Sequence, residues 1–188
     1  NTQNYDFPVK LQPIYLLDNQ GDNNEIKGKK AVVRTDTMQS LGIVSNDYGL
    51  VKHESVIDTF REAAKGMSVE ENISLTNDGG NLFYEMLFPK VQAEVQKGDL
   101  IRMRMIIKNS YNGTNSLQIV FGALRLVCLN GMVVGTKFLG FNYRHTKNIG
   151  VFSEDDSLDS GKVKDSLKSY MELFTNSLGQ MSIMANTK

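Results

Sequence analysis

The side chains best suited to chemistry in this sequence are bases gathered in residues 100–147. This segment holds seven Lys and Arg residues and not one Asp or Glu, whereas the whole chain of 188 residues has 21 bases, 21 acids and a formal net charge of zero. A segment whose charges all have one sign is informative about binding partners rather than about the fold. A positive segment favours an anionic partner. The seven bases are Arg102, Arg104, Lys108, Arg125, Lys137, Arg144 and Lys147.

A strand expected at residues 99–108 would align several of these bases. Alternate side chains of a strand face opposite ways, so Met103, Met105 and Ile107 share one face, which is suited to a core. The other face carries Arg102, Arg104, Ile106 and Lys108, a cationic stripe on an exposed sheet face. The alternative is an ordinary solvated face, although such faces usually interleave acids because like charges repel across strands.

Arg125 lies in a long apolar run between two Asn-Gly pairs, which are typical of tight hairpin turns. It alternates with Leu124, Leu126 and Cys128, which look like the core face. We therefore expect Arg125 to join the cationic stripe from a neighbouring strand. The alternative is an ion pair with an acid from the first half of the chain.

Aromatic residues accompany the bases in residues 138–148. Single-stranded nucleic acid is held by this mixture, because cations neutralise phosphates while aromatic rings stack on unpaired bases. We expect Tyr143 or Tyr111 to stack on bases, whereas Phe141 is better explained as a core residue. The candidate nucleic-acid-binding residues are Arg102, Arg104, Lys108, Arg125, Tyr143, Arg144 and Lys147, extended by Lys29, Lys30 and Arg34.

Enzyme and metal motifs are absent from the sequence. There is no phosphate-binding glycine loop and no nucleophile elbow, and a single cysteine excludes zinc-finger and ribbon sites. His53 and His145 are far apart in the sequence, and Cys128 in an apolar strand is a poor nucleophile. We expect no catalysis, no metal and no cofactor. The sequence contains no run of about 18 apolar residues, so it predicts no membrane-spanning helix.

The positions of turn residues and the hydrophobic periodicity predict an α+β fold. A short strand and a polar loop occupy residues 1–30, and alternating runs at 31–35 and 41–51 predict a hairpin. Apolar residues at helical spacing predict one helix from Glu54 to an end at Gly66 and a second helix from Lys162. Between the helices we expect strands at 72–76, 81–88, 99–108, 116–129 and 132–140. The prediction is a twisted antiparallel β-meander with an N-terminal β-hairpin and two helices packed on one face. Segments 1–30, 31–150 and 151–188 would form one domain.

Three stretches of this sequence resemble a known family. They are AVVRTDTMQSLGIVSNDYGLVKHESVIDTF, NSYNGTNSLQIVFGALRLVCLNGM and YRHTKN. They resemble the opening hairpin and helix, the central hairpin and the Arg-His-Thr-Lys segment of the phage/plasmid-like family known as domain of unknown function 932. The resemblance covers residues 31–148. It departs at Leu129, which stands between Cys128 and Asn130. It implies a mobile-element protein that works on DNA inside a bacterium, with Arg125, Arg144, His145 and Lys147 in a shared site.

These observations favour a non-enzymatic protein that binds single-stranded DNA in the bacterial host cytoplasm. Strand annealing during bacteriophage DNA replication or recombination is the extended form of this hypothesis, and such a protein would be expected to form homo-oligomers. The alternative is a structural, regulatory or anti-defence phage protein whose basic face meets an acidic protein surface. A metal-dependent nuclease would need clustered acids, which the basic segment lacks.

Overall fold

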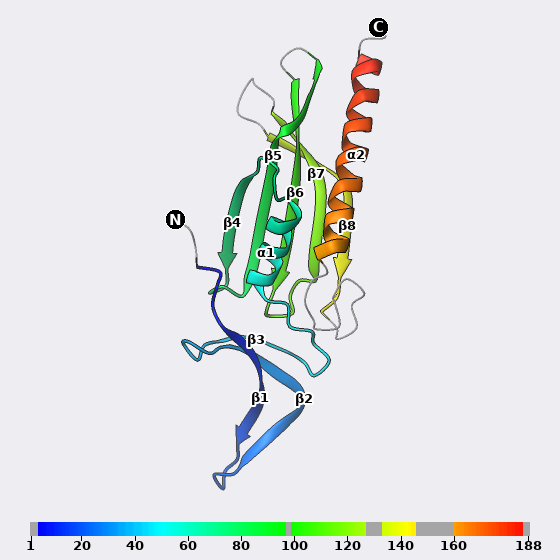
Figure 1. Ribbon diagram of the computed structural model, residues 1–188. Helices are drawn as coiled ribbons and strands as arrows, with labels where there is room; N and C mark the ends of the chain where they lie inside the picture. Colours follow the sequence, from blue (N-terminus) through cyan, green and yellow to red (C-terminus); the bar gives the residue numbers. More distant parts are fainter. Residues whose placement is uncertain (1–3, 97–98, 127–132, 146–159, 186–188) are drawn as a thin grey trace.

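The five-stranded antiparallel sheet is the largest element of the fold. The computed structural model describes residues 4–96, 99–126, 133–145 and 160–185 (Figure 1). The strands follow one another in the order β4-β5-β6-β7-β8, so the predicted meander is confirmed. Their bounds are β4 Glu70–Thr76, β5 Asn81–Gln96, β6 Asp99–Ser110, β7 Leu117–Leu126 and β8 Val133–Tyr143.

The pleat of this sheet separates a core face from an open face. On β6 the side chains of Met103, Met105 and Ile107 are fully buried, as their alternation predicts. Tyr84 on β5 and Phe121 on β7 are buried on the same side. We call the opposite side, which the helices do not cover, the open face.

Two helices cover the core face, as predicted (Figure 1). Helix α1, His53–Ala63, buries Val56, Ile57 and Phe60 completely. It stops before Gly66, whose φ of +85° an L side chain rarely adopts. Helix α2, Ser160–Ala185, buries four side chains at helical spacing, Val163, Leu167, Tyr170 and Phe174.

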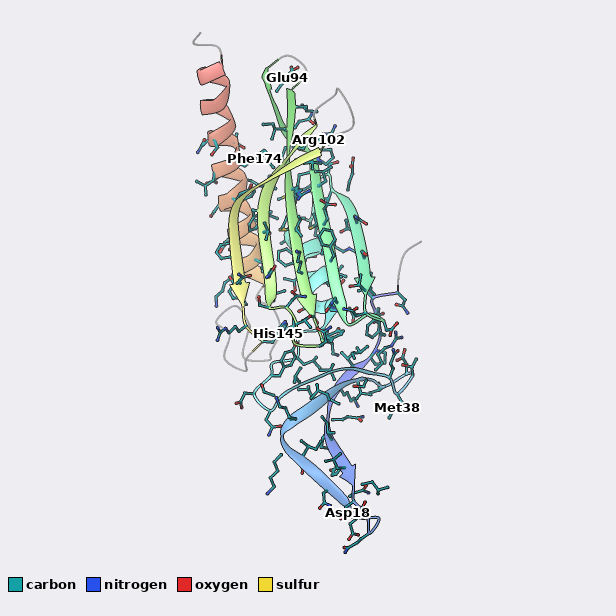
Figure 2. All side chains as sticks on the ribbon, turned by 180° about the vertical axis from the view of Figure 1, so that it is seen from behind. Asp18, Met38, Glu94, Arg102, His145 and Phe174 are labelled. Atoms are coloured by element: carbon teal, nitrogen blue, oxygen red, sulfur yellow. The ribbon has the colours of Figure 1, made fainter. Side chains whose placement is uncertain are left out.

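A second, three-stranded sheet lies beyond one end of the meander (Figure 1). It consists of β1 Val9–Leu17, β2 Asn23–Arg34 and β3 Ser40–Ser45, in the order β1-β2-β3. The predicted hairpin corresponds to β2–β3. The polar loop predicted up to residue 30 is wrong from residue 23 onward, because β2 already begins at Asn23. Polar residues of β2 pair with β1, as Glu25 does with Tyr15. The β1–β2 hairpin therefore projects as an arm (Figure 2).

The turn of the arm is closed by one carboxylate. Asp18 Oδ1 accepts hydrogen bonds from the backbone N–H groups of Gln20 and Asp22, both at 2.9 Å. These bonds lower the pKa of Asp18 below its ordinary value. An Asx-type turn of this kind explains why a stretch of Asp, Asn and Gly can form a hairpin.

The two sheets are joined by a small core of their own. It contains Phe7, Val9, Val32, Leu41, Val44, Tyr48 and Tyr111. Here β3 comes so close to the β6–β7 turn that a Cβ on Gly42 would lie 2.4 Å from the Asn112 Cα. Only glycine permits that approach, so Gly42 fixes how the small sheet sits against the meander.

Candidate nucleic-acid interface

A buried polar cluster lies where the two sheets meet. His53 is completely buried, and its ring stacks on Tyr111 with centroids 3.9 Å apart. The Asn109 amide donates to His53 Nδ1 at 2.9 Å, so Nε2 carries the proton and donates to the Gly79 carbonyl at 3.0 Å. Both ring nitrogens are therefore occupied.

The environment of His53 keeps it neutral. Its pKa is lowered to about 4, chiefly by burial and to a smaller extent by the nearby His145, although the hydrogen bond to the Gly79 carbonyl acts in the opposite direction. A neutral histidine with both nitrogens engaged can neither bind a metal nor take a proton from a ligand. His53 is therefore a structural residue, which its sequence position did not indicate.

Tyr111 belongs to the same cluster, and the prediction that it stacks on nucleic-acid bases is wrong. Its side chain is 1% exposed, and its hydroxyl accepts a hydrogen bond from the His53 backbone N–H at 2.7 Å. Burial raises its pKa above the ordinary tyrosine value. No ring face of Tyr111 is available to a base.

His145 is held at the other side of the junction. Its ring stacks on Tyr48 with centroids 4.9 Å apart. Nδ1 lies 3.2 Å from the Gly49 carbonyl, which can only accept, so Nδ1 carries the proton of the neutral ring. Burial lowers the pKa of His145. Nε2 is then a buried acceptor, and it has no hydrogen-bond partner among the described residues.

His145 forms one wall of a pocket between the two sheets, which we call the junction pocket. Its volume is about 340 Å³. It is lined by Lys29, Ile43, Val44, Ser45, Tyr48, Asn112, Gly113, Asn115, Ser116, Arg144 and His145. The fold thus brings together three of the predicted binding residues, Lys29 from β2 and the adjacent pair Arg144 and His145 after β8. Lys29 and Arg144 are exposed.

The other bases predicted near Lys29 do not line this pocket. Arg34 forms an ion pair with Asp36 at 2.7 Å, and its guanidinium lies 4.0 Å from the centre of the Phe7 ring. The pair raises the pKa of Arg34 and lowers that of Asp36. Lys30 is a half-buried neighbour of Lys29 on β2. Lys147 lies outside the described residues.

The open face carries the predicted cationic stripe, but acids reach it from β5. Arg102, Arg104 and Lys108 lie on the side opposite the buried Met103 and Met105, as predicted. Arg104 pairs with Glu85 at 3.3 Å, and Arg102 Nε donates to Gln92 Oε1 at 3.0 Å. Figure 2 shows this face, with Arg102 toward the end far from the arm.

The side chain of Arg125 lies outside the described part of the structure, so its place in the stripe stays a prediction. In the register of the sheet its partner on β6 is Ile101. Leu124, assigned to the core from sequence, pairs instead with Arg102. The alternation of an apolar strand does not say which set faces the core when both sets contain large apolar residues.

The register also fixes the backbone position of Lys137, whose side chain lies outside the described part of the structure. Lys137 on β8 pairs with Gly122 on β7, and Gly122 pairs with Arg104. A bulge between Phe121 and Gly122 shifts this register, which is why strand periodicity alone could not place Lys137.

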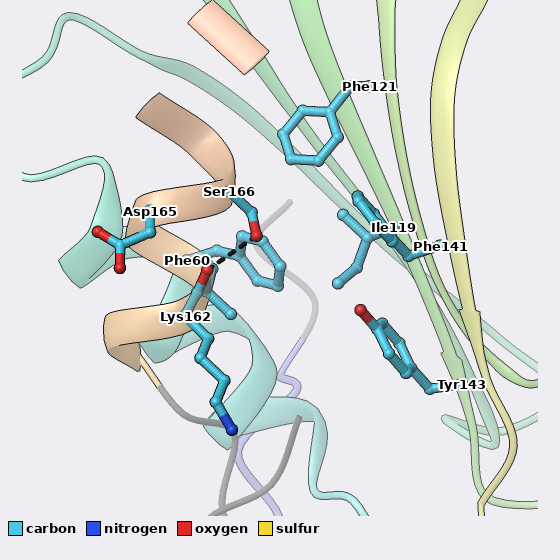
Figure 3. A pocket seen from close by; sticks show the side chains of 9 residues that line it. Phe60, Ile119, Phe121, Phe141, Tyr143, Lys162, Asp165 and Ser166 are labelled. Carbon is cyan, nitrogen blue, oxygen red and sulfur yellow. Dashed lines mark hydrogen bonds between the residues drawn. The ribbon is translucent and has the colours of Figure 1, made fainter. Parts of the chain in front are cut away.

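Tyr143 lies in a different hollow from Arg144 and His145. This aromatic groove, of about 320 Å³, runs between β7, β8 and the start of α2 (Figure 3). It is lined by Phe60, Ile119, Phe121, Phe141, Tyr143, Lys162, Val163, Asp165 and Ser166. Phe141 is half-buried there, so it is partly a core residue as expected. Burial raises the pKa of Tyr143.

The described residues contain neither a metal-binding cluster nor a membrane-spanning helix. No three His, Cys, Asp or Glu side chains there lie close enough to hold a metal ion. In the same part of the chain no helix is long and apolar enough to cross a membrane.

Comparison with known proteins identifies one family. No curated protein matches the chain, and no solved structure matches it either. One family, described only as a domain of unknown function (DUF932), matches residues 40–188. This range contains the five-stranded sheet, both helices and every lining residue of the junction pocket except Lys29. Because the match spans most of its length, the chain belongs to the DUF932 family.

Proposed function

We propose that the protein binds single-stranded DNA, with the junction pocket holding one nucleotide of the strand. The observation that carries this proposal is the placement of Lys29 and Arg144 at a pocket that is also lined by His145, whose buried Nε2 has no hydrogen-bond partner among the described residues. Two exposed cations suit a phosphate, and a recessed neutral acceptor suits an N–H or O–H donor of a base or sugar. A nucleotide presents both kinds of group at a short separation.

The open face continues from this pocket. Asn115, which lines the pocket, accepts through its carbonyl from the Ser110 hydroxyl at 2.8 Å, and Ser110 ends β6. Lys108, Arg104 and Arg102 follow along that strand, over about 20 Å at the usual strand rise. A DNA backbone that leaves the pocket in this direction would meet three cations in succession.

A pocket of this kind favours unpaired over paired bases. His145 lines the pocket and is only 8% exposed, so a base approaches its ring only by entering the pocket. A base in a duplex keeps its Watson–Crick edge hydrogen-bonded and stacked, and extracting it costs a few kcal/mol. We therefore propose preference for single strands.

Strand annealing during phage or plasmid replication or recombination is the extended form of the proposal. It would place the protein in a bacterial host cytoplasm and require several copies to act on two strands. Support for this form comes from the resemblance of the sequence to phage and plasmid proteins.

Fluorescence anisotropy with one labelled oligonucleotide, alone and as a duplex, tests the proposal. Titrations at several salt concentrations should show tighter binding of the single strand and a log–log salt slope of about −0.7 per phosphate contacted. Equal binding of both forms, or none, contradicts it.

A second candidate function is binding of a protein partner, and one observation favours it. Glu85 already neutralises Arg104, and the half-buried Phe83, Leu87 and Ile106 surround this pair on the open face. Such a mixed surface suits a protein interface. Under this alternative, removal of the Arg104 or Arg144 charge leaves DNA affinity unchanged and lowers affinity for an acidic protein captured from the host.

A further inference from the structure

We propose that the arm tip of one copy of this chain binds the aromatic groove of a second copy. The arm tip is the end of the β1–β2 hairpin, residues 15–25, and the aromatic groove is the hollow between β7, β8 and α2 (Figure 3). The contact would join copies head to tail. This inference is independent of DNA binding, because neither surface contains Lys29, Arg144 or His145.

The arm tip exposes three consecutive large apolar side chains. Tyr15, Leu16 and Leu17 are 53%, 61% and 71% exposed. They account for three of the seven large apolar side chains that are exposed within the described ranges. Consecutive strand residues point to both faces of the hairpin, so neither face of the arm tip is covered. An apolar cluster at the end of a projecting hairpin is typical of an interaction site.

The aromatic groove offers the matching apolar surface. Its floor consists of Ile119, Phe121 and Phe141, and Phe121 meets Phe141 edge to face with centroids 6.3 Å apart. Lys162 and Ser166 line its other side on α2 (Figure 3). The volume of about 320 Å³ falls in the range of pockets that bury an apolar ligand. One or two aliphatic side chains of an arm could enter it.

The charges of the two surfaces are complementary. Residues 11–26 contain three acids, Asp18, Asp22 and Glu25, and no base. The first turns of α2 contain three bases, Lys162, Lys164 and Lys168, against the single acid Asp165. Opposite potentials steer two surfaces together and fix their register. This complementarity identifies the occupant as the arm of this chain, rather than any apolar peptide.

Geometry excludes an arm that fills its own groove. Figures 1 and 2 both show the arm tip at the end of the small sheet that is far from the meander, pointing away from α2 and β8. A head-to-tail contact between two different surfaces continues from copy to copy, so it generates a ring if it closes and a filament if it does not. The arm precedes the residues that match the family, which begin at residue 40.

The test is the mass of the full chain in solution, measured by size-exclusion chromatography with light scattering. The wild type should form assemblies larger than a dimer. Leu16→Asp combined with Leu17→Asp removes the apolar arm tip, and Ser166→Trp fills the groove from an exposed helix position. Each variant alone should shift to the 21.0 kDa monomer. Met38→Asp, at an equally exposed apolar residue outside the arm tip, is the matched control and should assemble as the wild type does.

Mixing the two variants gives the decisive result. One intact arm and one intact groove remain, so the mixture should form a dimer and nothing larger. Circular dichroism and thermal melting establish that each variant is folded before mixing. A monomeric wild type, variants that assemble normally, or a mixture that stays monomeric would each overturn the proposal. A monomeric variant that still binds a short single strand separates this interface from the DNA site.

Discussion

His53 and Tyr111 stack face to face at 3.9 Å, and the His53 backbone N–H donates to the Tyr111 hydroxyl across 58 residues of sequence. The pair joins the first residue of α1 to the residue that follows β6. Through it the small sheet, the helix and the meander meet at one buried point. The junction pocket is tied to this point because the Tyr48 hydroxyl donates to the carbonyl of Ser110, the neighbour of Tyr111, at 2.7 Å, and the Tyr48 ring stacks on His145.

The Tyr111 hydroxyl can be tested alone. Tyr111→Phe keeps the stacked ring but leaves the buried His53 N–H without an acceptor, so we expect a loss of about 1–3 kcal/mol in the free energy of unfolding. Urea denaturation measures it. Tyr15→Phe, at an exposed tyrosine, is the control and should change stability little. An unchanged Tyr111→Phe variant would show that the hydrogen bond contributes nothing.

The stability of the protein should fall in mild acid because of His53. Its folded-state pKa is about 4, below the ordinary value of 6.5, because burial disfavours the charged ring. Between these two pH values the unfolded chain binds a proton that the folded chain does not. The contribution of His53 to the free energy of unfolding is therefore complete above pH 6.5. It is lost as the pH falls toward 4, and the total loss is about 3 kcal/mol.

The pH dependence can be assigned by comparing variants. Urea unfolding at pH 7.5 and pH 4.5 should give a smaller difference for His53→Gln than for the wild type, since glutamine does not titrate. The pKa of His145 is lowered in the same direction, so part of the slope should remain. Identical pH slopes for both proteins would contradict the assignment to His53.

Gly42 provides a test of the contact between the sheets. In Gly42→Ala the new Cβ would lie 2.4 Å from the Asn112 backbone, so the β6–β7 turn must move. We expect a loss of about 1–3 kcal/mol in unfolding free energy, with a displaced amide resonance for Gly113 in the junction pocket. Ser40→Ala, on the same strand with an exposed side chain and outside the junction pocket, is the control. Wild-type stability and spectrum would contradict the close approach.

Glu85 should restrain DNA binding on the open face. Glu85→Gln frees Arg104 from its ion pair, so we expect affinity for single-stranded DNA to rise severalfold and the salt slope to steepen by about 0.7. Stability should change by no more than about 1 kcal/mol, because the pair is partly exposed. Glu62→Gln on α1, which frees Lys65 just after the helix, is the control. Unchanged affinity would remove Arg104 from the proposed DNA path.

Local patterns in the sequence predicted most elements of the fold, because hydrophobic periodicity and turn residues act over short distances. Met103 and Met105 faced the core as expected, and the Asn77–Gly80 turn formed with Asn77 and Asp78 at positive φ. The arm did not follow from periodicity, because β2 opens with polar residues whose strand conformation depends on pairing with β1.

The candidate site could be predicted only in part, because it depends on register and long-range contacts. Lys29 and Arg144 were identified by type and His145 through the family resemblance, but their union in one pocket depends on how the two sheets meet. Leu124 was assigned to the core face although it pairs with Arg102 of the open face, because its strand is apolar on both sides. A segment that contains no acids in the sequence can still lie beside acids in the fold. Arg104, for example, forms an ion pair with Glu85 on the preceding strand.

The central claim is that the junction pocket contacts DNA phosphates through Lys29 and Arg144. The most direct measurement is the salt dependence of single-strand affinity, by anisotropy, for the wild type, Lys29→Ala, Arg144→Ala and the control Lys65→Ala, at a residue just after α1. We expect each pocket variant to bind more weakly, with a log–log slope smaller by about 0.7, while the control matches the wild type. Pocket variants with the affinity and slope of the control would contradict it.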